Sequence, residues 1–82
     1  MVHVVALITT FPGKRETVLT EFRKIVPLVH AEQGCIEYQP VVDNDSLGDF
    51  QSMLGEDSFM VIEKWDTAAD LDAHSKLSLI HI

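Results

Sequence analysis

The sequence has a single cysteine, no long apolar run and little positive charge, and each shortage excludes a class of protein. Cys35 alone cannot form an internal disulfide, which fits a reducing cytoplasm. No apolar run approaches the roughly 20 residues of a membrane helix, and the first residues lack the basic stretch and cleavage site of a signal peptide. We therefore expect a cytoplasmic protein with no membrane partner.

Positive charge and ligand clusters are also scarce. Thirteen acidic residues against six basic ones give a net charge of −7, and no basic cluster extends beyond adjacent pairs, so we expect no nucleic-acid partner. None of the glycines opens a helix in the pattern of a phosphate loop. His3, His30, His74 and His81 are scattered and Cys35 is isolated, so we expect no metal site.

What the chain does contain is a regular alternation of apolar segments, with 46% hydrophobic residues in 82 positions. Apolar, β-branched segments predict strands over 3–10, 35–42 and 59–65. Helical spacing predicts one helix from Lys14, kinked at Pro27 and stopped by Gly34. A second, shorter helix over 68–76 follows the N-cap signal of Asp66-Thr67.

The resulting order, β-α-β-β-α, predicts an α+β fold of the ferredoxin-like split βαβ type, with helices on one face of a small antiparallel sheet. Strand 3–10 and residues 59–62 are apolar on both sides, so we expect the second face to pack against another subunit's sheet in a homodimer. A domain this small also gains stability from a partner. The long loop 43–58 is either a functional lid, a partner contact or a plain surface excursion.

Few polar groups could reach an apolar pocket in such a fold, and Tyr38, Glu63, Trp65 and His74 are the candidates for proton transfer. Each also has a purely structural interpretation. Trp65 is a core residue whose N–H needs a buried partner, and His74 is a solvated or capping residue. Glu63 faces solvent or pairs with a nearby lysine, and Tyr38 is half-buried with its hydroxyl at the surface. Cys35 is either a small buried hydrophobe or a nucleophile.

Four short motifs, covering most of residues 3–75, together resemble the antibiotic biosynthesis monooxygenase family, which includes the quinol monooxygenases. In chain order they are Val26-Pro27, Glu32-x-Gly34-Cys35-x-x-Tyr38, Val61-Ile62-Glu63-Lys64-Trp65 and Leu71-x-Ala73-His74. The resemblance implies a dimeric ferredoxin-like α/β barrel. It also implies that Cys35 lies at the turn into the second strand and is a corner rather than a nucleophile.

Enzymes of this family oxidise quinols and polycyclic phenols with dioxygen, using neither metal nor flavin. That chemistry is reasonable because a deprotonated phenol is electron-rich enough to reduce oxygen, so the protein supplies a base, donors and a dry cavity. The resemblance thus implies a cofactor-independent monooxygenase with a small aromatic substrate and dioxygen. It makes His74 the base or proton shuttle, lets Trp65 and Tyr38 orient the ring, and gives Glu63 the task of holding a neighbouring donor.

Two alternatives remain open from the sequence. A non-catalytic dimer that binds a small ligand or serves in a stress response would need no proton-transfer residues in its pocket. A haem-degrading branch of the superfamily also has a tryptophan ending the third strand and a later histidine. That branch uses an asparagine on the first strand, whereas the only asparagine here is Asn44 in the loop, so this alternative is the weaker one.

The chain departs from the family pattern after His74. Relatives usually continue into a fourth strand, so we expect residues 1–82 to form a single domain truncated at the C-terminus, with that strand missing or altered. In the family's strand order, 4-1-3-2, the loss would leave 2–8 as an unpaired edge. Either residues 77–82 substitute for the missing strand or a segment of another chain does.

Overall fold

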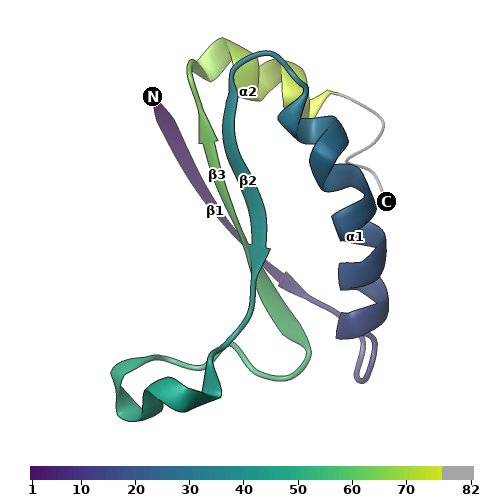
Figure 1. The fold of residues 1–82 in the computed structure, drawn as a ribbon, viewed down its shortest axis with the longest axis vertical. Helices are drawn as coiled ribbons and strands as arrows, with labels where there is room; N and C mark the ends of the chain where they lie inside the picture. Colours follow the sequence, from purple (N-terminus) through teal and green to yellow (C-terminus); the bar gives the residue numbers. More distant parts are fainter. Residues whose placement is uncertain (77–82) are drawn as a thin grey trace.

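The computed structural model describes residues 1–76, without the side chains of residues 45, 47 and 49, and shows helices on one face of an antiparallel sheet (Figure 1). Its elements are β1 (Val2–Thr9), α1 (Arg15–His30), β2 (Cys35–Val41), the 3₁₀ helix η1 (Asp45–Phe50), β3 (Ser58–Trp65) and α2 (Ala68–Ser75). The predicted α+β class and element order are confirmed. The expected substitute strand at 77–82 lies outside the described residues.

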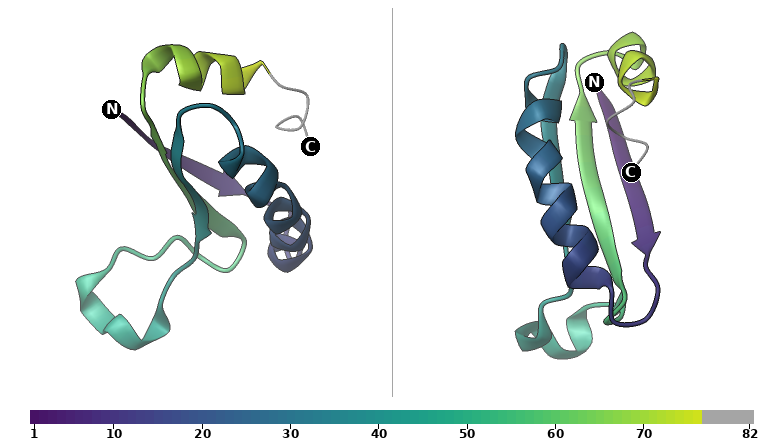
Figure 2. Two further views of the ribbon diagram at one scale, coloured as in Figure 1. Left: turned by 45° about the horizontal axis from the view of Figure 1, so that its top comes forward. Right: turned by 90° about the vertical axis from the view of Figure 1, so that its right-hand side faces the viewer.

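Strand β3, the last strand of the described residues, is the central strand in the sheet, whose order is β1-β3-β2. Both neighbours of β3 run antiparallel to it, and Glu63 is paired with Val4 on one side and Tyr38 on the other. In the right-hand view of Figure 2, β1 forms one edge of the sheet and α1 lies along β2 at the other. This register places Tyr38, Glu63 and Trp65 on the same face, because side chains two apart on a strand share a face.

The two faces of the sheet have different surroundings. On the helix-covered face, Leu19 and Val29 of α1 pack with Tyr38 and with the β3 side chains of Phe59, Val61 and Trp65 in one buried cluster. On the open face, Val5 is 63% exposed and Leu7 is 60% exposed. In β1, partly buried and exposed side chains alternate. The composition of this strand had predicted cover on both faces, but within one chain only the helix-covered face is covered.

The first helix ends earlier than predicted, and the stop signal is not Gly34. Helix α1 runs through Pro27 to His30, and the N–H of the next residue, Ala31, donates to the carbonyl of Pro27 at 3.2 Å. Residue Gly34 instead takes a positive φ of 81° in the turn into β2. The prediction was wrong because a glycine after a helical pattern marks either a helix end or a separate turn.

Gly34 also lies where the second helix closes onto this turn. A Cβ at position 34 would come within 2.1 Å of Oδ2 of Asp70, so only glycine fits without a shift. The N–H of Asp66 donates to the Gly34 carbonyl at 2.8 Å. The predicted N-cap of α2 is confirmed, since Oγ1 of Thr67 accepts from the N–H of Asp70 at 3.1 Å. These contacts fix α2 against the turn between α1 and β2.

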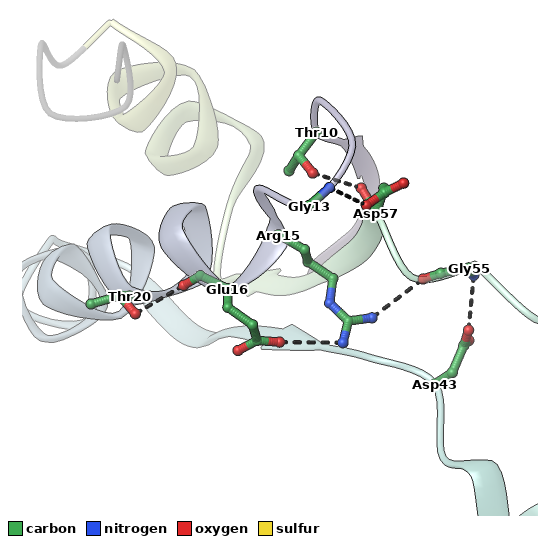
Figure 3. Close-up of polar contacts among 8 residues, drawn as sticks. All are labelled: Thr10, Gly13, Arg15, Glu16, Thr20, Asp43, Gly55 and Asp57. Atoms are coloured by element: carbon green, nitrogen blue, oxygen red, sulfur yellow. Dashed lines mark hydrogen bonds and ion pairs between the residues drawn. The ribbon is translucent and has the colours of Figure 1, made fainter.

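The long loop between β2 and β3 projects from the end of the sheet toward the side opposite α1 (Figure 1). At the base of the loop, the carboxylate of Asp43 accepts hydrogen bonds from the N–H groups of Leu54 and Gly55 at 2.8 and 2.9 Å, which connects the two ends of the loop. Those hydrogen bonds lower the pKa of Asp43 below its usual value. Figure 3 shows that Arg15 also donates to the carbonyl of Gly55, at 3.3 Å. No helix in the described part is long and apolar enough to cross a bilayer.

Candidate functional site

The four candidate residues named from the sequence meet in one buried cluster. Strand β2 contributes Tyr38, β3 contributes Glu63 and Trp65, and α2 brings His74 over them. The ring centroids of Trp65 and His74 are 4.7 Å apart, and those of Tyr38 and His74 are 5.5 Å apart. None of the four is more than 8% exposed. They converge because the register of the sheet puts the three strand residues on the face that α2 covers.

Glu63 is held by the indole of Trp65. Trp65 Nε1 donates to Oε1 of Glu63 at 2.9 Å, and both side chains are buried. The interpretation that Glu63 faces solvent or pairs with a lysine was therefore wrong. Lys64 points to the other face, where its ammonium lies 3.3 Å from the Glu37 carboxylate. Because strand neighbours alternate between faces, the polar pair Glu63-Lys64 is divided between the core and the open face.

Tyr38 is fully within the core and not half-buried, as its position on a strand had suggested, since only 5% of it is exposed. Its ring stacks on Phe22 of α1 with centroids 5.4 Å apart. Burial, helped by the negative charges of Glu63 and Glu32, raises the pKa of Tyr38 to about 12. Because the phenol stays protonated at ordinary pH, Tyr38 can donate a hydrogen bond but is a poor base.

His74 is neither solvated nor a cap. It is 6% exposed, and its Nδ1 lies 2.9 Å from Oε1 of Glu32, a residue 42 positions away in the chain. Glu32 occurs in one of the motifs that carried the family resemblance, but sequence reasoning gave it no role. Nothing in the sequence pairs two residues so far apart, and the contact depends on α2 packing against the α1–β2 turn.

Only one of the two carboxylate oxygens of Glu32 has a hydrogen-bond partner among the described residues. Its side chain is 14% exposed, and Oε2 is buried without a hydrogen-bond partner among the described residues. A buried acceptor with no donor is uncommon in proteins and calls for an explanation. The cluster therefore contains one buried carboxylate, Glu63, which accepts a hydrogen bond from an indole, and one partly buried carboxylate, Glu32, which contacts an imidazole through one of its two oxygens.

Cys35 lies at the corner where the turn enters β2. It is partly buried, unpaired with any other cysteine, and next to a register shift between positions 35 and 37. Burial, followed by the charges of Glu32 and Glu63, raises the pKa of the Cys35 thiol. A protonated thiol in a carboxylate-rich site is a weak nucleophile, so the geometry favours the corner over the nucleophile.

A cavity of about 350 Å³ opens between α1 and the sheet. Its lining is almost entirely apolar and consists of Ile8, Thr17, Val18, Glu21, Phe22, Ile25, Tyr38 and Phe59. Of the four candidate residues, Tyr38 alone lines this cavity, and the ring centroid of His74 lies 5.5 Å from that of Tyr38. Tyr38 is thus the link between the hollow that could hold a ligand and the groups that could move a proton.

The cluster can exchange protons with an apolar ligand but has no evident means to hold a metal. In the described part of the chain, no three His, Cys, Asp or Glu side chains are grouped as a metal site would need. An imidazole backed by a carboxylate, a neutral phenol and an adjacent apolar cavity are the parts of a general acid–base site for an aromatic alcohol.

Comparison with known proteins places this geometry in a family. Residues 1–80 match the family described as antibiotic biosynthesis monooxygenase. The Escherichia coli K12 protein named probable quinol monooxygenase YgiN is 47% identical over 76 residues, which cover 90% of this chain and 72% of that protein. The strength and length of these matches identify a family and not only a shared fold.

Solved structures agree with this match. PA3566 from Pseudomonas aeruginosa superposes with a TM-score of 0.76 at 28% identity, over 96% of this chain and 71% of that one. A crystal structure titled antibiotic biosynthesis monooxygenase gives 0.75 at 27% identity, over 99% of this chain and 76% of that one. The ferredoxin-like fold and the family resemblance read from the sequence are both confirmed, and the chain belongs to the antibiotic biosynthesis monooxygenase family.

Proposed function

We propose that the chain is a cofactor-independent monooxygenase that oxidises a quinol or polycyclic phenol with dioxygen. The observation that carries the proposal is the buried imidazole of His74, which is backed by a carboxylate and packs against Tyr38, a residue that lines an apolar cavity. The 47% identity to a protein named as a probable quinol monooxygenase supports the same substrate class.

The proposed chemistry needs the protein to remove one proton and to keep water away. His74 takes the proton of a ring hydroxyl, and the electron-rich phenolate then reduces dioxygen. One oxygen atom replaces a ring hydrogen, which turns a phenol into a quinone or a quinol into a hydroxyquinone. The other oxygen atom leaves as water, so the substrate supplies all four electrons. The site needs no external reductant for this balance.

The other three residues orient the reacting groups. Tyr38, as a neutral phenol at the cavity wall, donates a hydrogen bond to an oxygen on the substrate ring. Its own ring packs against the imidazole of His74. Trp65 lies against the imidazole, and Glu63 fixes the indole through the hydrogen bond at its N–H. Each of these groups is buried, so its rotamer is set before a ligand arrives, which is the condition for an oriented reaction.

The size of the cavity narrows the substrate. Ligand pockets commonly measure roughly 300–1,000 Å³, and the present cavity, at about 350 Å³, is at the small end of that range. One or two fused rings fit this volume better than three or four. We therefore expect small quinols to be better substrates than large polycyclic phenols.

The proposed active form is a homodimer in the cytoplasm. The open face presents Val5 and Leu7 to solvent in a single chain, and a second copy of the same sheet would bury them. Domains of this size bury a smaller share of their surface than larger ones, so the interface would also stabilise the fold. The unpaired thiol of Cys35 fits a reducing compartment.

Oxygen uptake with a panel of quinols of one to four rings tests the proposal, with chelator present and no flavin added. The chain is compared with His74→Ala and with His30→Ala at equal dimer content. His30 is a matched control because its Nε2 lies 2.9 Å from the backbone carbonyl of Tyr38 and outside the side-chain cluster. Uptake that requires His74 and not His30 supports the proposal, and no uptake from folded protein contradicts it.

A non-catalytic ligand-binding dimer is the second candidate. It is favoured by the fact that His74, Trp65 and Glu63 do not line the cavity. On this alternative, a small quinol quenches Trp65 fluorescence on binding, binds His74→Ala equally well, and is not consumed. The same panel, measured once by fluorescence and once by oxygen electrode, separates the two functions.

A further inference from the structure

The contact between Glu32 and His74 determines which ring nitrogen is available. A carboxylate oxygen accepts hydrogen bonds, so its 2.9 Å contact with Nδ1 requires that Nδ1 carry the proton. Nε2 of a neutral imidazole then keeps its lone pair, and within the described residues no hydrogen bond occupies it. Fixing one tautomer in this way is how an orienting carboxylate prepares a histidine base.

We infer that Glu32 is the positioning residue of His74. It holds the imidazole as the Nδ1–H tautomer and stabilises the imidazolium that forms when Nε2 takes a proton. In that step the ligand O–H bond breaks, an N–H bond forms at Nε2, and the electron pair stays on the ligand oxygen. The inference rests on the proposed function, because it gives Glu32 a part in the same proton transfer.

Backbone contacts hold Glu32 where this role needs it. The N–H of Glu32 donates to the Val29 carbonyl at 2.9 Å, and its carbonyl accepts from Cys35 at 3.3 Å. On the other side, α2 is held to the same turn by the close approach of Gly34 and Asp70. The carboxylate and the imidazole are therefore carried by two segments that contact one another directly, and the Asp66 N–H to Gly34 carbonyl hydrogen bond joins the same segments.

The second oxygen of Glu32 is the feature that the fold alone does not explain. Oε2 is buried without a partner among the described residues, and a buried acceptor without a donor calls for an explanation. Glu63, the buried carboxylate of the cluster, already accepts from Trp65 and is not the hydrogen-bond partner of His74. This leaves Glu32 as the carboxylate that supports the imidazole.

The tautomer of His74 is tested directly by two-bond ¹H–¹⁵N correlation NMR of the full chain, with no ligand present. The samples are wild type, Glu32→Ala and Glu37→Gln. Glu37 is a matched control, a partly exposed carboxylate that pairs with Lys64 on the open face. We expect Nδ1–H in wild type and Glu37→Gln, and a shift to Nε2–H in Glu32→Ala. A wild-type Nε2–H tautomer, or an unchanged tautomer in Glu32→Ala, overturns the inference.

Kinetics of Glu32→Gln, which keeps the side-chain volume, cover the case in which Glu32→Ala does not fold. Where a histidine binds a metal, loss of its orienting partner typically lowers activity by about 10- to 100-fold, and we take the same range for a histidine base. We expect a fall of that size in kcat with KM changed by less than about twofold, while Glu37→Gln behaves as wild type. A wild-type kcat in Glu32→Gln overturns the inference. If wild type consumes no oxygen, the proposed function fails, whereas the NMR measurement still decides the tautomer.

Discussion

The two faces of the sheet have similar apolar side chains but different surroundings. On the helix-covered face Phe59, Val61 and Trp65 are at most 3% exposed, while Val5 and Leu7 on the open face are 60% exposed or more. The covered face also admits polar side chains, provided they are paired, as Glu63 and His74 are. Apolar composition therefore does not distinguish a face buried within the chain from one that a second copy would bury.

Removing a large side chain from the covered face is expected to have the largest effect. Phe59→Ala should lower the free energy of unfolding by about 3–5 kcal/mol, because the ring is 1% exposed and its removal leaves a cavity. Denaturant titration measures the free energy of unfolding of Phe59→Ala and of Leu7→Ala, a variant on the open face. The loss in Phe59→Ala should not depend on protein concentration, whereas that in Leu7→Ala should. Equal losses at every concentration would remove the distinction between the faces.

A charge on the open face tests whether a second copy covers it. Leu7→Lys should weaken a homodimer by roughly 100-fold or more, since an unpaired ammonium would be buried at the interface. The far-ultraviolet circular dichroism should stay native, because residue 7 contributes little to the chain's own core. Light scattering coupled to size exclusion measures the mass. A monomeric wild type, or a variant that remains dimeric at low concentration, would contradict the proposed interface.

Gly34→Ala sharpens the comparison at the edge of the covered face. Gly34 and Gly13 have similar positive φ values, 81° and 77°, but only Gly34 has a side chain in its way, that of Asp70. Gly34→Ala should cost about 1–3 kcal/mol from strain and steric conflict together. Gly13→Ala should lower the free energy of unfolding by less, since at that position only the positive φ is unfavourable and no side chain is in the way. Thermal unfolding of the pair gives the difference, and an equal loss in both would show that α2 is free to move.

Tyr38 reports on the covered face through its titration, and it is the only tyrosine in the chain. Its pKa is raised from 10.0 to about 12, so the folded protein binds this proton more tightly than the unfolded chain. The corresponding stability is complete below pH 10 and is lost as the pH rises to about 12. Tyrosinate absorbance after rapid mixing to high pH measures the midpoint. A midpoint at 10 in folded protein would mean that the ring is exposed.

The smallest effect is expected at the base of the loop, away from both faces. Asp43→Asn removes a charged acceptor from the N–H groups of Leu54 and Gly55. Amide hydrogen exchange of these two residues should accelerate while global stability stays unchanged. In wild type, the pKa of Asp43 is lowered in the folded protein. The stabilisation from its two hydrogen bonds is therefore fully present at pH values above the ordinary pKa of an aspartate, and it is lost as the pH falls through the lower pKa of the folded state. Unchanged exchange in Asp43→Asn would show that the backbone holds the loop unaided.

Sequence reasoning located the elements and gathered Tyr38, Glu63, Trp65 and His74 because few polar residues occur in apolar segments. It missed Glu32, since a pairing across 42 residues depends on how two turns pack. It also misread Gly34, because a helix stop and a turn glycine have the same local sequence. An apolar pocket was expected, but its volume and its lining could not be predicted, since empty volume arises from packing and is not encoded by any one segment.

The position of β3 at the centre of the sheet has a consequence for the growing chain on the ribosome. Among residues 1–76, β1 and β2 each bond only to β3, so neither can form these pairings until residues 58–65 have been synthesised. Pairing across such separations is intrinsically slow. The nascent chain therefore emerges with two apolar strands unpaired until β3 follows, and chaperone binding would be most useful during that interval.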